Sequence, residues 1–179
     1  MNMNLQPTHL ENDLIKLVPL ASDDLERLYL VASDPLIWDQ HPNKFRYKRD
    51  VFQAFFNEAI ASGSAFLIFD AKTNEVIGSS RYYDYDAAKG EIAIGYTFLA
   101  RSCWGGTYNR ALKQLMIDHA FESVGSVLLH IGEGNIRSQK AAMKIGGKKV
   151  GQIEMEMPGE AYKLNYIFEI TKEDWNKPA

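Results

Sequence analysis

The sequence has little cysteine: Cys103 is the only one among 179 residues. A single thiol excludes a disulfide framework within the chain and any zinc site built on several thiolates, and we expect no metal site. Basic residues are not in excess either, because 20 Lys and Arg stand against 23 Asp and Glu. A protein whose main task is to bind nucleic acid needs a surplus of Lys and Arg to meet the phosphate backbone. We therefore expect no nucleic-acid partner.

Long apolar runs are also absent. No stretch approaches the roughly 18 apolar residues of a membrane-spanning helix, and the start MNMNLQPTHLEND has no apolar segment behind basic residues. These absences argue against a membrane partner and, with the lone cysteine, favour the cytoplasm. No proline occurs between Pro42 and Pro158, which fits one packed core. We expect a single domain over 1–179 with a flexible start over 1–10.

The first third of the chain predicts one strand and two helices. Residues 13–20 alternate apolar and polar side chains, which is typical of a strand. Ser22 is expected to cap a following helix. Residues 34–48 lack clear periodicity and are expected to be irregular or partly helical. Asp50 is expected to cap a second helix that Gly63 ends. Its core face consists of Phe52, Phe55, Phe56, Ala59 and Ile60.

The rest of the chain begins with three β-type runs over 64–100, separated by the turn-like segments DAKTNE and YDAAKG. They predict an antiparallel meander. A helix with two distinct faces follows. Its apolar stripe consists of Tyr108, Ala111, Leu112, Leu115, Met116 and His119. Its opposite, polar face consists of Asn109, Arg110, Lys113, Gln114 and Asp118. We then expect a strand over 126–131, a helix over 135–147, and strands near 148–156 and 161–170.

This order predicts an α/β (α+β) fold, with a mixed, mostly antiparallel central sheet of about seven strands flanked by about four helices. Within it, Gly105 and Gly106 stand at the mouth of a helix. The first N–H groups of a helix lack internal partners and carry partial positive charge, so a pyrophosphate binds well there. Alternatively, the two glycines only turn the chain. The segment lacks the endings of a Walker A loop and the spaced glycines of a dinucleotide fingerprint.

Two segments, EIAIGYTFLARSCWGGTYNRALKQLM over 91–116 and NIRSQKAAMKIGG over 135–147, resemble the acetyl-CoA-binding core of the GNAT superfamily of N-acetyltransferases. The similarity is closest to the branch of ribosomal-protein N-terminal acetyltransferases, in which GY, WG and N-x-x-S recur in this order. The resemblance implies a sheet whose fourth and fifth strands splay apart, with the pantetheine arm of acetyl-CoA between them. It also leaves a homodimer open.

The resemblance further implies which residues meet acetyl-CoA. The pantetheine arm would contact the backbone of Phe98, Leu99 and Ala100. The family's pyrophosphate loop, Gln/Arg-x-x-Gly-x-Gly/Ala, aligns with Trp104, Gly105, Gly106, Thr107, Tyr108 and Asn109. Thr107 and Asn109 depart from that pattern. Asn135 and Ser138 match positions near the pantetheine and pyrophosphate, or else serve as a helix cap and a small packing residue. Five basic residues near this helix would contact the adenosine phosphates or, alternatively, only solvent: Arg137, Lys140, Lys144, Lys148 and Lys149.

Direct transfer to an amine needs an acceptor for the amine's proton, a donor to the oxyanion, and a route out for the thiolate. Glu91 is our candidate base; the alternative is a solvated residue at a strand edge. Many family members carry a tyrosine acid seven residues after the asparagine, but Ala142 stands there. Tyr96, Tyr108 or water would then be the acid, unless both tyrosines are core aromatics.

Two further side chains have weaker claims. His130 could relay a proton or be buried and hydrogen-bonded. Cys103 is not expected to be a nucleophile, because direct transfer needs no covalent step.

The acceptor groove implied by the resemblance comprises residues 34–48 and 154–166. Its acidic residues Glu154, Glu156 and Glu160 would suit a cationic amine, although acidic loops are often simply solvated. The expected partner is a primary amine, on a protein N-terminus or a small molecule. Two other functions stay open: a non-catalytic acyl-CoA-binding or regulatory module on the same fold, and a nucleotide-binding domain of unrelated fold.

Overall fold

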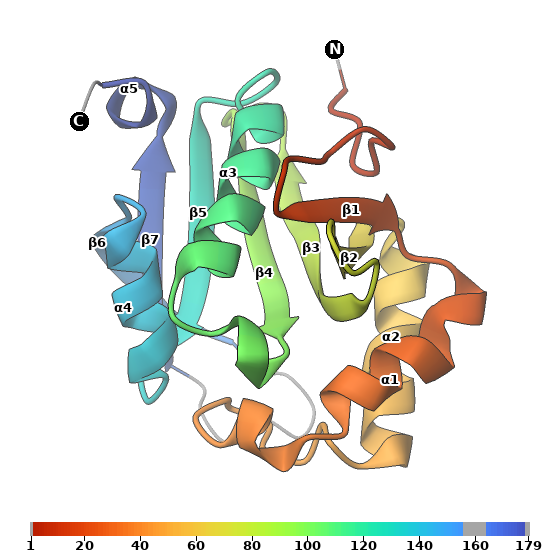
Figure 1. Cartoon of the computed structure of the whole chain (residues 1–179). Helices are drawn as coiled ribbons and strands as arrows, with labels where there is room; N and C mark the ends of the chain where they lie inside the picture. The colour runs from red at the N-terminus through yellow and green to blue at the C-terminus, as the bar shows by residue number, and fades with distance from the viewer. Residues whose placement is uncertain (1, 156–163, 178–179) are drawn as a thin grey trace.

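The protein, described here as a computed structural model for residues 2–155 and 164–177, is built on one seven-stranded sheet (Figure 1). The strand order is β1-β2-β3-β4-β5-β7-β6. Only β4 and β5 pair in parallel. The strands are β1 Ile15–Pro19, β2 Ala65–Asp70, β3 Val76–Asp86, β4 Glu91–Leu99, β5 Ser126–Gly132, β6 Lys148–Glu154 and β7 Leu164–Thr171. The predicted mixed, mostly antiparallel sheet is confirmed.

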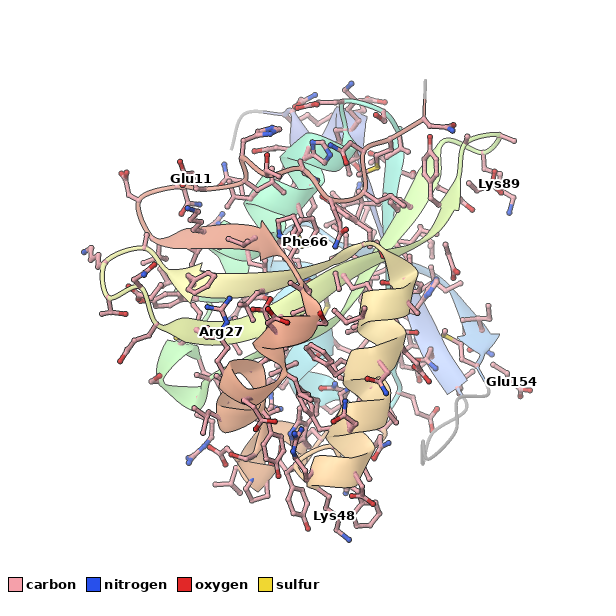
Figure 2. All side chains as sticks on the ribbon, turned by 90° about the vertical axis from the view of Figure 1, so that its right-hand side faces the viewer. Glu11, Arg27, Lys48, Phe66, Lys89 and Glu154 are labelled. Carbon is pink, nitrogen blue, oxygen red and sulfur yellow. The ribbon has the colours of Figure 1, made fainter. Side chains whose placement is uncertain are left out.

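Helices cover both faces of this sheet. They are α1 Leu25–Ala32, α2 Arg49–Ser62, α3 Thr107–Ala120, α4 Ile136–Lys144 and the one-turn α5 Lys172–Trp175. The last of these has no counterpart among the predicted elements. Figure 1 shows α3 and α4 in front of the sheet, while Figure 2, turned by 90°, shows α1 and α2 on the other side. Within the described residues, no helix has both the length and the apolarity needed to cross a membrane.

The core consists of two apolar clusters, one on each face of the sheet. Strand β2 separates them, because successive side chains of a strand point to opposite faces. Phe66 and Ile68 pack with α3, whereas Ala65 and Leu67 pack with α1 and α2. The predicted face of α2 is largely confirmed: its four buried residues are Phe52, Phe55, Phe56 and Ala59, and Gly63 ends the helix at φ 60°.

Two predicted helix caps are wrong. Ser22 opens a single 3-10 turn, Ser22–Asp24, ahead of α1. The carboxylate of Asp24 accepts the N–H of the cap residue Ala21 there at 2.8 Å, while the Ser22 hydroxyl donates to Asp23 Oδ1 at 3.5 Å and accepts no backbone N–H from the described chain. Asp50 lies inside the first turn of α2, where its charge still suits the helix dipole. The cap is Lys48, because its carbonyl already accepts the Phe52 N–H.

The start of the chain packs against the core, in contrast to the flexible segment that we expected. Met3 and Leu10 are buried in the cluster beneath α3. The Gln6 Nε2 donates to the Ala65 carbonyl at 2.9 Å, and the His119 Nε2 lies 2.8 Å from the Asn4 carbonyl. Apolar burial and two polar contacts therefore hold this segment in place.

Candidate active site

The sheet opens at its centre. Strands β4 and β5 pair only from Glu91↔Ser126 to Ala93↔Leu128 and separate beyond that point, as predicted for the fourth and fifth strands. Strand β4 is also irregular, because its register with β3 shifts between Ser79 and Arg81. Opposite this shift Tyr96 adopts φ 52°, a left-handed conformation that costs a non-glycine residue roughly 1–2 kcal/mol. The irregularity bends β4 away from β5.

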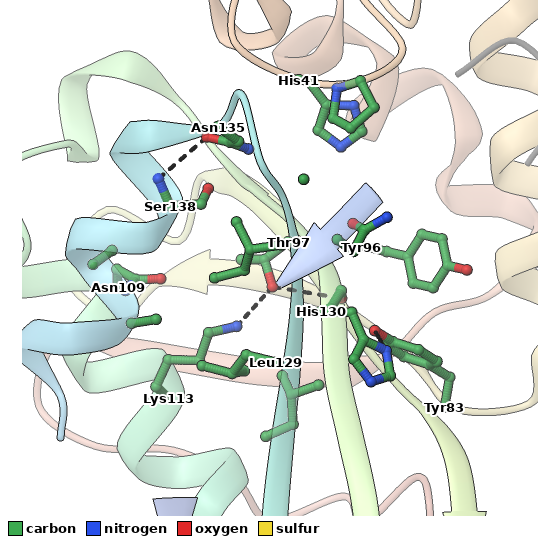
Figure 3. Close-up of a pocket in the computed structure, with 18 of the residues that line it drawn as sticks. His41, Tyr83, Tyr96, Thr97, Asn109, Lys113, Leu129, His130, Asn135 and Ser138 are labelled. Atoms are coloured by element: carbon green, nitrogen blue, oxygen red, sulfur yellow. Dashed lines mark hydrogen bonds between the residues drawn. The ribbon is translucent and has the colours of Figure 1, made fainter. Parts of the chain in front are cut away.

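Two connected cavities occupy the opening. The larger, about 900 Å³ and here called the outer channel, runs from the loop before α3 past Phe98 and Leu99. The smaller, about 180 Å³ and here called the inner cavity, is lined by Tyr83, Tyr96 and His130 (Figure 3). The walls common to both include His41, Thr97, Asn109, Asn135 and Ser138. The cleft is therefore continuous, and these shared residues mark its junction.

The outer channel reaches the N-terminus of α3. Gly105 and Gly106 adopt φ 115° and 105°, which side chains rarely tolerate. A Cβ added at either glycine would meet no protein atom within 4 Å, so the space in front of the backbone is open. Within the described chain, the backbone N–H groups of residues 105–109 donate to no acceptor, and the first helical bond is Arg110 N–H to the Gly106 carbonyl. The glycines thus present a row of unpaired donors.

Thr107 and Asn109, which depart from the family pattern, begin a regular helix and line the channel with Trp104. Positive charge surrounds them. The basic residues of the channel wall are Arg110, Arg137, Lys140 and Lys144, and the only acid among the described wall residues is Asp13. Lys148 and Lys149 lie elsewhere: the first pairs with Asp174 and the second lies over Tyr166. An anion in the channel would therefore meet both N–H donors and cationic side chains.

Arg137 ties three segments together above the channel. Its guanidinium carbon lies 4.0 Å from the centroid of the Trp104 ring, and its Nη2 donates to the Ile37 carbonyl at 3.1 Å. A second nitrogen pairs with Asp39 at 3.3 Å. The η2 turn, Pro35–Trp38, is itself held by the Asp34 carboxylate, which accepts the Leu36 N–H. The irregular segment expected over 34–48 thus forms part of the cleft wall.

Asn135 and Ser138 sit at the junction of the two cavities, although Asn135 is also the N-cap of α4. Its Oδ1 accepts the Ser138 N–H at 3.2 Å (Figure 3). The capping alternative therefore holds for Asn135 together with its position in the cleft. Among the expected pantetheine contacts, Leu99 lines the channel but its carbonyl accepts the Trp104 Nε1 at 3.0 Å. Ala100 lines neither cavity, and its N–H donates to the carbonyl of Ile77 on β3.

Three titratable rings form one wall of the inner cavity. The Tyr83 hydroxyl lies 2.9 Å from His130 Nδ1, and the Tyr83 and Tyr96 ring centroids are 5.1 Å apart. Burial raises the pKa of Tyr83 far above its usual range and lowers the pKa of His130. At neutral pH the phenol therefore keeps its proton and the imidazole is uncharged. The Arg81 guanidinium covers the other side of Tyr96, with its carbon 3.5 Å from the ring centroid.

Lys113 enters the cleft from α3 and was not among the site residues that we predicted. Its Nζ donates to Thr97 Oγ1 at 2.8 Å (Figure 3), and Thr97 Oγ1 also lies 2.8 Å from Ser80 Oγ. The residue is only 6% exposed, and burial lowers its pKa to about 7. We expected Lys113 on the polar face of this helix, opposite the apolar stripe, and its burial was not predicted, because the separation of β4 and β5 places part of that face in the cleft. The available signal was its spacing, one helical turn after Asn109.

Two predicted catalytic residues lie away from the cleft. Glu91 is at the paired end of β4, 3.5 Å from Lys89 at the tip of the β3–β4 hairpin (Figure 2), and lines neither cavity. At about 3.3 Å per strand residue it is roughly 20 Å from Thr97. The Tyr108 hydroxyl donates to Asp70 at 2.6 Å, which raises the pKa of that tyrosine to about 12. Its side chain also lines neither cavity.

The remaining candidate residues are a cysteine, two polar residues that were not predicted, and the acidic residues of the expected acceptor groove. Burial raises the pKa of the Cys103 thiol, which disfavours the thiolate form. Arg46 and Asn165 line the inner cavity, and they fall within the segments 34–48 and 154–166 that the resemblance implied for the acceptor groove, although neither residue was singled out there. Glu154 is exposed on β6 (Figure 2), whereas Glu156 and Glu160 fall outside the described residues.

Comparisons with solved structures agree with this architecture. A probable acetyltransferase of the GNAT family from Chromobacterium violaceum superposes with a TM-score of 0.85 at 17% identity, over 99% of this chain and 93% of that one. A spermidine N-acetyltransferase from Vibrio cholerae, solved with CoA and spermine, gives a TM-score of 0.70 at 16% identity, over 93% and 100% of the two chains. At these identities the likeness shows the fold alone.

A candidate ribosomal-protein-serine acetyltransferase from Vibrio cholerae matches at 14% identity with a TM-score of 0.74, over 90% of this chain and 96% of that one. No curated protein matches the chain. The family profile described as Acetyltransferase (GNAT) domain matches residues 15–148, which span β1 through α4 and most of the cleft wall. A nucleotide-binding domain of unrelated fold is thereby excluded. The chain belongs to the GNAT acetyltransferase family.

Proposed function

We propose that this protein is an N-acetyltransferase that transfers the acetyl group of acetyl-CoA directly to a primary amine. The observation that carries the proposal is the continuous cleft at the β4–β5 opening. Unpaired backbone donors lie at one end of it, and neutral titratable groups lie at the other. The fold that it shares with a spermidine N-acetyltransferase solved with CoA and spermine adds support for this pair of substrates.

The outer channel fits acetyl-CoA. The free N–H groups of residues 105–109 suit the pyrophosphate. Arg110, Lys140 and Lys144 offer charge to the remaining phosphate. The edge of β4 beyond Ala93 has no partner strand on the β5 side, so it can hydrogen-bond an extended pantetheine arm. This arrangement leads the arm toward Thr97 and the inner cavity, with Asn135 and Ser138 alongside.

The inner cavity is where the amine would react. An amine attacks only in its neutral form, and it loses a further proton as the amide forms. When His130 Nδ1 donates its hydrogen to the Tyr83 oxygen, Nε2 is left as an acceptor, and it has no other partner in the described structure. We therefore assign proton acceptance to His130 in place of Glu91. Tyr96 remains a second candidate for contact with the reacting groups, because it lines the same cavity.

The acceptor is a primary amine on a protein N-terminus or a small molecule, and the ribosomal-protein branch remains one candidate for its source. We place the reaction in the cytoplasm and within one domain. An N–H on the open edge of β4 is suited to stabilise the oxyanion, because backbone donors need no special side chain.

The first test is calorimetric titration of acetyl-CoA into the purified protein, with ADP and free pantetheine as controls. Saturable binding that needs both halves of the molecule is expected. A panel of amines is then assayed by release of the CoA thiol. No binding at millimolar acetyl-CoA would overturn the donor assignment, and binding with no thiol release for any amine would leave an acyl-CoA-binding module instead.

The assignment of His130 is tested by comparing two variants, His130→Gln and Glu91→Gln. His130→Gln is expected to lower kcat by about 100-fold, the lower end of what general-base catalysis contributes. Its affinity for acetyl-CoA should be unchanged, because the outer channel is untouched. Glu91→Gln should keep full activity, since Glu91 lines neither cavity. The reverse ranking of the two variants would return the role of base to Glu91.

A further inference from the structure

The side chain of Lys113 contacts Thr97, toward which the proposed function leads the sulfur of the donor. When a tetrahedral intermediate collapses, the carbon–sulfur bond breaks and its electron pair goes to sulfur. The resemblance implies a tyrosine acid at the position of Ala142, and the structure places Ala142 in the wall of the inner cavity with only a methyl group to offer. The developing thiolate is therefore met either by water or by another side chain of this cavity. Lys113 lies across the same cavity, on α3.

The geometry around Lys113 singles it out. Thr97, which accepts from its Nζ, belongs to the walls of both cavities and so marks their junction. An ammonium group has three N–H donors, and the described structure provides one acceptor. No Asp or Glu is present among the described residues of the inner cavity wall. A buried cation with spare donors and no counter-charge is prepared for an anionic partner from outside the chain.

We propose that Lys113 is the catalytic acid that transfers a proton from Nζ to the departing CoA sulfur. This inference rests on the proposed acetyl transfer. The acceptor nitrogen bonds to the acetyl carbon, the carbon–sulfur bond breaks, and Lys113 protonates the thiolate to give the CoA thiol. The acceptor nitrogen releases one proton to His130 or water, and Lys113 regains one from solvent when the products leave. Protons and charge therefore balance over one turnover.

The acidity of Lys113 supports this role. Burial lowers its pKa to about 7, whereas a free thiol has a pKa of about 8.5. Transfer from the ammonium to the thiolate is thus favourable, and the neutral lysine remains available for reprotonation near neutral pH. A purely structural side chain here would be better served by a hydrocarbon, because an apolar residue of similar volume avoids the cost of desolvation.

The test follows the thiol of bound CoA by the ultraviolet absorbance of its thiolate as pH is raised. Wild type is compared with Lys113→Met and Lys113→Arg, after circular dichroism has confirmed that each is folded. The other titratable groups that face the inner cavity are common to all three proteins: His41, Arg46, Tyr83, Tyr96 and His130. An exposed substitution of the same type, Lys72→Met, is the matched control.

In wild type and in Lys113→Met the bound thiol should ionise at nearly the same pH, because a lysine with a pKa of about 7 is already neutral at the pH where a thiol with a pKa of about 8.5 ionises. Lys113→Arg should instead lower the pH at which the bound thiol ionises by at least about one unit, because arginine keeps its charge beside the thiolate. Turnover should nevertheless fall in both variants, by about 100-fold in Lys113→Met with the KM for acetyl-CoA unchanged, because arginine does not release its proton. The control should match wild type in every measurement.

Identical thiol titrations in Lys113→Arg and Lys113→Met would overturn the assignment while leaving the proposed acetyl transfer intact, because the side chain at position 113 would then not face the sulfur. Loss of CoA binding in folded Lys113→Met would also overturn it, because Lys113 would then be a binding residue. An acetyl adduct on Lys113, seen by intact mass in wild type and absent in Lys113→Met, would show that Nζ attacks the thioester and does not protonate sulfur. Failure of wild type to bind CoA would overturn both proposals.

Discussion

Replacing Lys113 with methionine should make the protein more stable at neutral pH and less dependent on pH. The folded-state pKa of about 7 lies below the ordinary value of 10.5. Between these values the unfolded chain binds more protons than the folded one, so stability rises with pH in this window. The linkage relation gives a cost of about 4 kcal/mol at pH 7 and about 2 kcal/mol at pH 9.

Lys113→Met removes this cost and also the hydrogen bond to Thr97, which contributes about 1 kcal/mol. The net gain in the free energy of unfolding should then be about 3 kcal/mol at pH 7 and about 1 kcal/mol at pH 9. Urea unfolding of wild type, Lys113→Met and the exposed control Lys72→Met at both pH values measures it. A variant that is less stable than wild type at pH 7, or a difference that does not shrink with pH, would refute the reasoning.

Three further outcomes are expected. Gly106→Ala should lose about 1–2 kcal/mol of stability because of its positive φ, and also bind acetyl-CoA more weakly, whereas Gly63→Ala should lose stability alone; urea unfolding and calorimetry separate the two, and equal affinities would contradict a phosphate cradle. Tyr108→Phe should lower the free energy of unfolding, because the bond to Asp70 is lost, but it should keep its activity in the thiol-release assay. Arg110→Gln should weaken acetyl-CoA binding several-fold at low salt, and a titration at high salt should show a smaller difference; a salt-independent loss would argue against a phosphate contact.

Local pattern predicted most of the framework. The apolar stripe of α2 and the stop at Gly63 followed from helical spacing, and the meander over β2 to β4 followed from its two turn segments. These features depend on residues close in sequence, which is why periodicity reveals them. The predicted caps Ser22 and Asp50 were wrong because a cap is not fixed by local pattern alone. Several neighbouring residues can cap a helix, and tertiary packing selects among them.

The candidate site was harder to predict, because the opening between β4 and β5 is a tertiary feature without a local signature. Tyrosine seldom adopts positive φ, so nothing in the sequence announced the bend at Tyr96. That bend decides which side chains meet the cleft. It brings in Lys113, which reads as a solvent-facing lysine, and leaves Glu91 at the paired end of the strand. The role of Gly105 and Gly106 was easier to predict, because their backbone adopts positive φ and this conformation favours glycine at these positions.

The short ladder between β4 and β5 also has an evolutionary consequence. Extending the pairing past Ala93 and Leu128 would add backbone hydrogen bonds and join the two halves of the sheet more firmly. It would also close the cleft. Screening for stabilising substitutions would therefore favour variants in which the pairing of β4 with β5 is longer. The most stable of these variants would have lost the cleft and would be inactive. Selection for thermal tolerance alone is a poor guide to improving this scaffold; stability is better sought under α1 and α2, away from the gap.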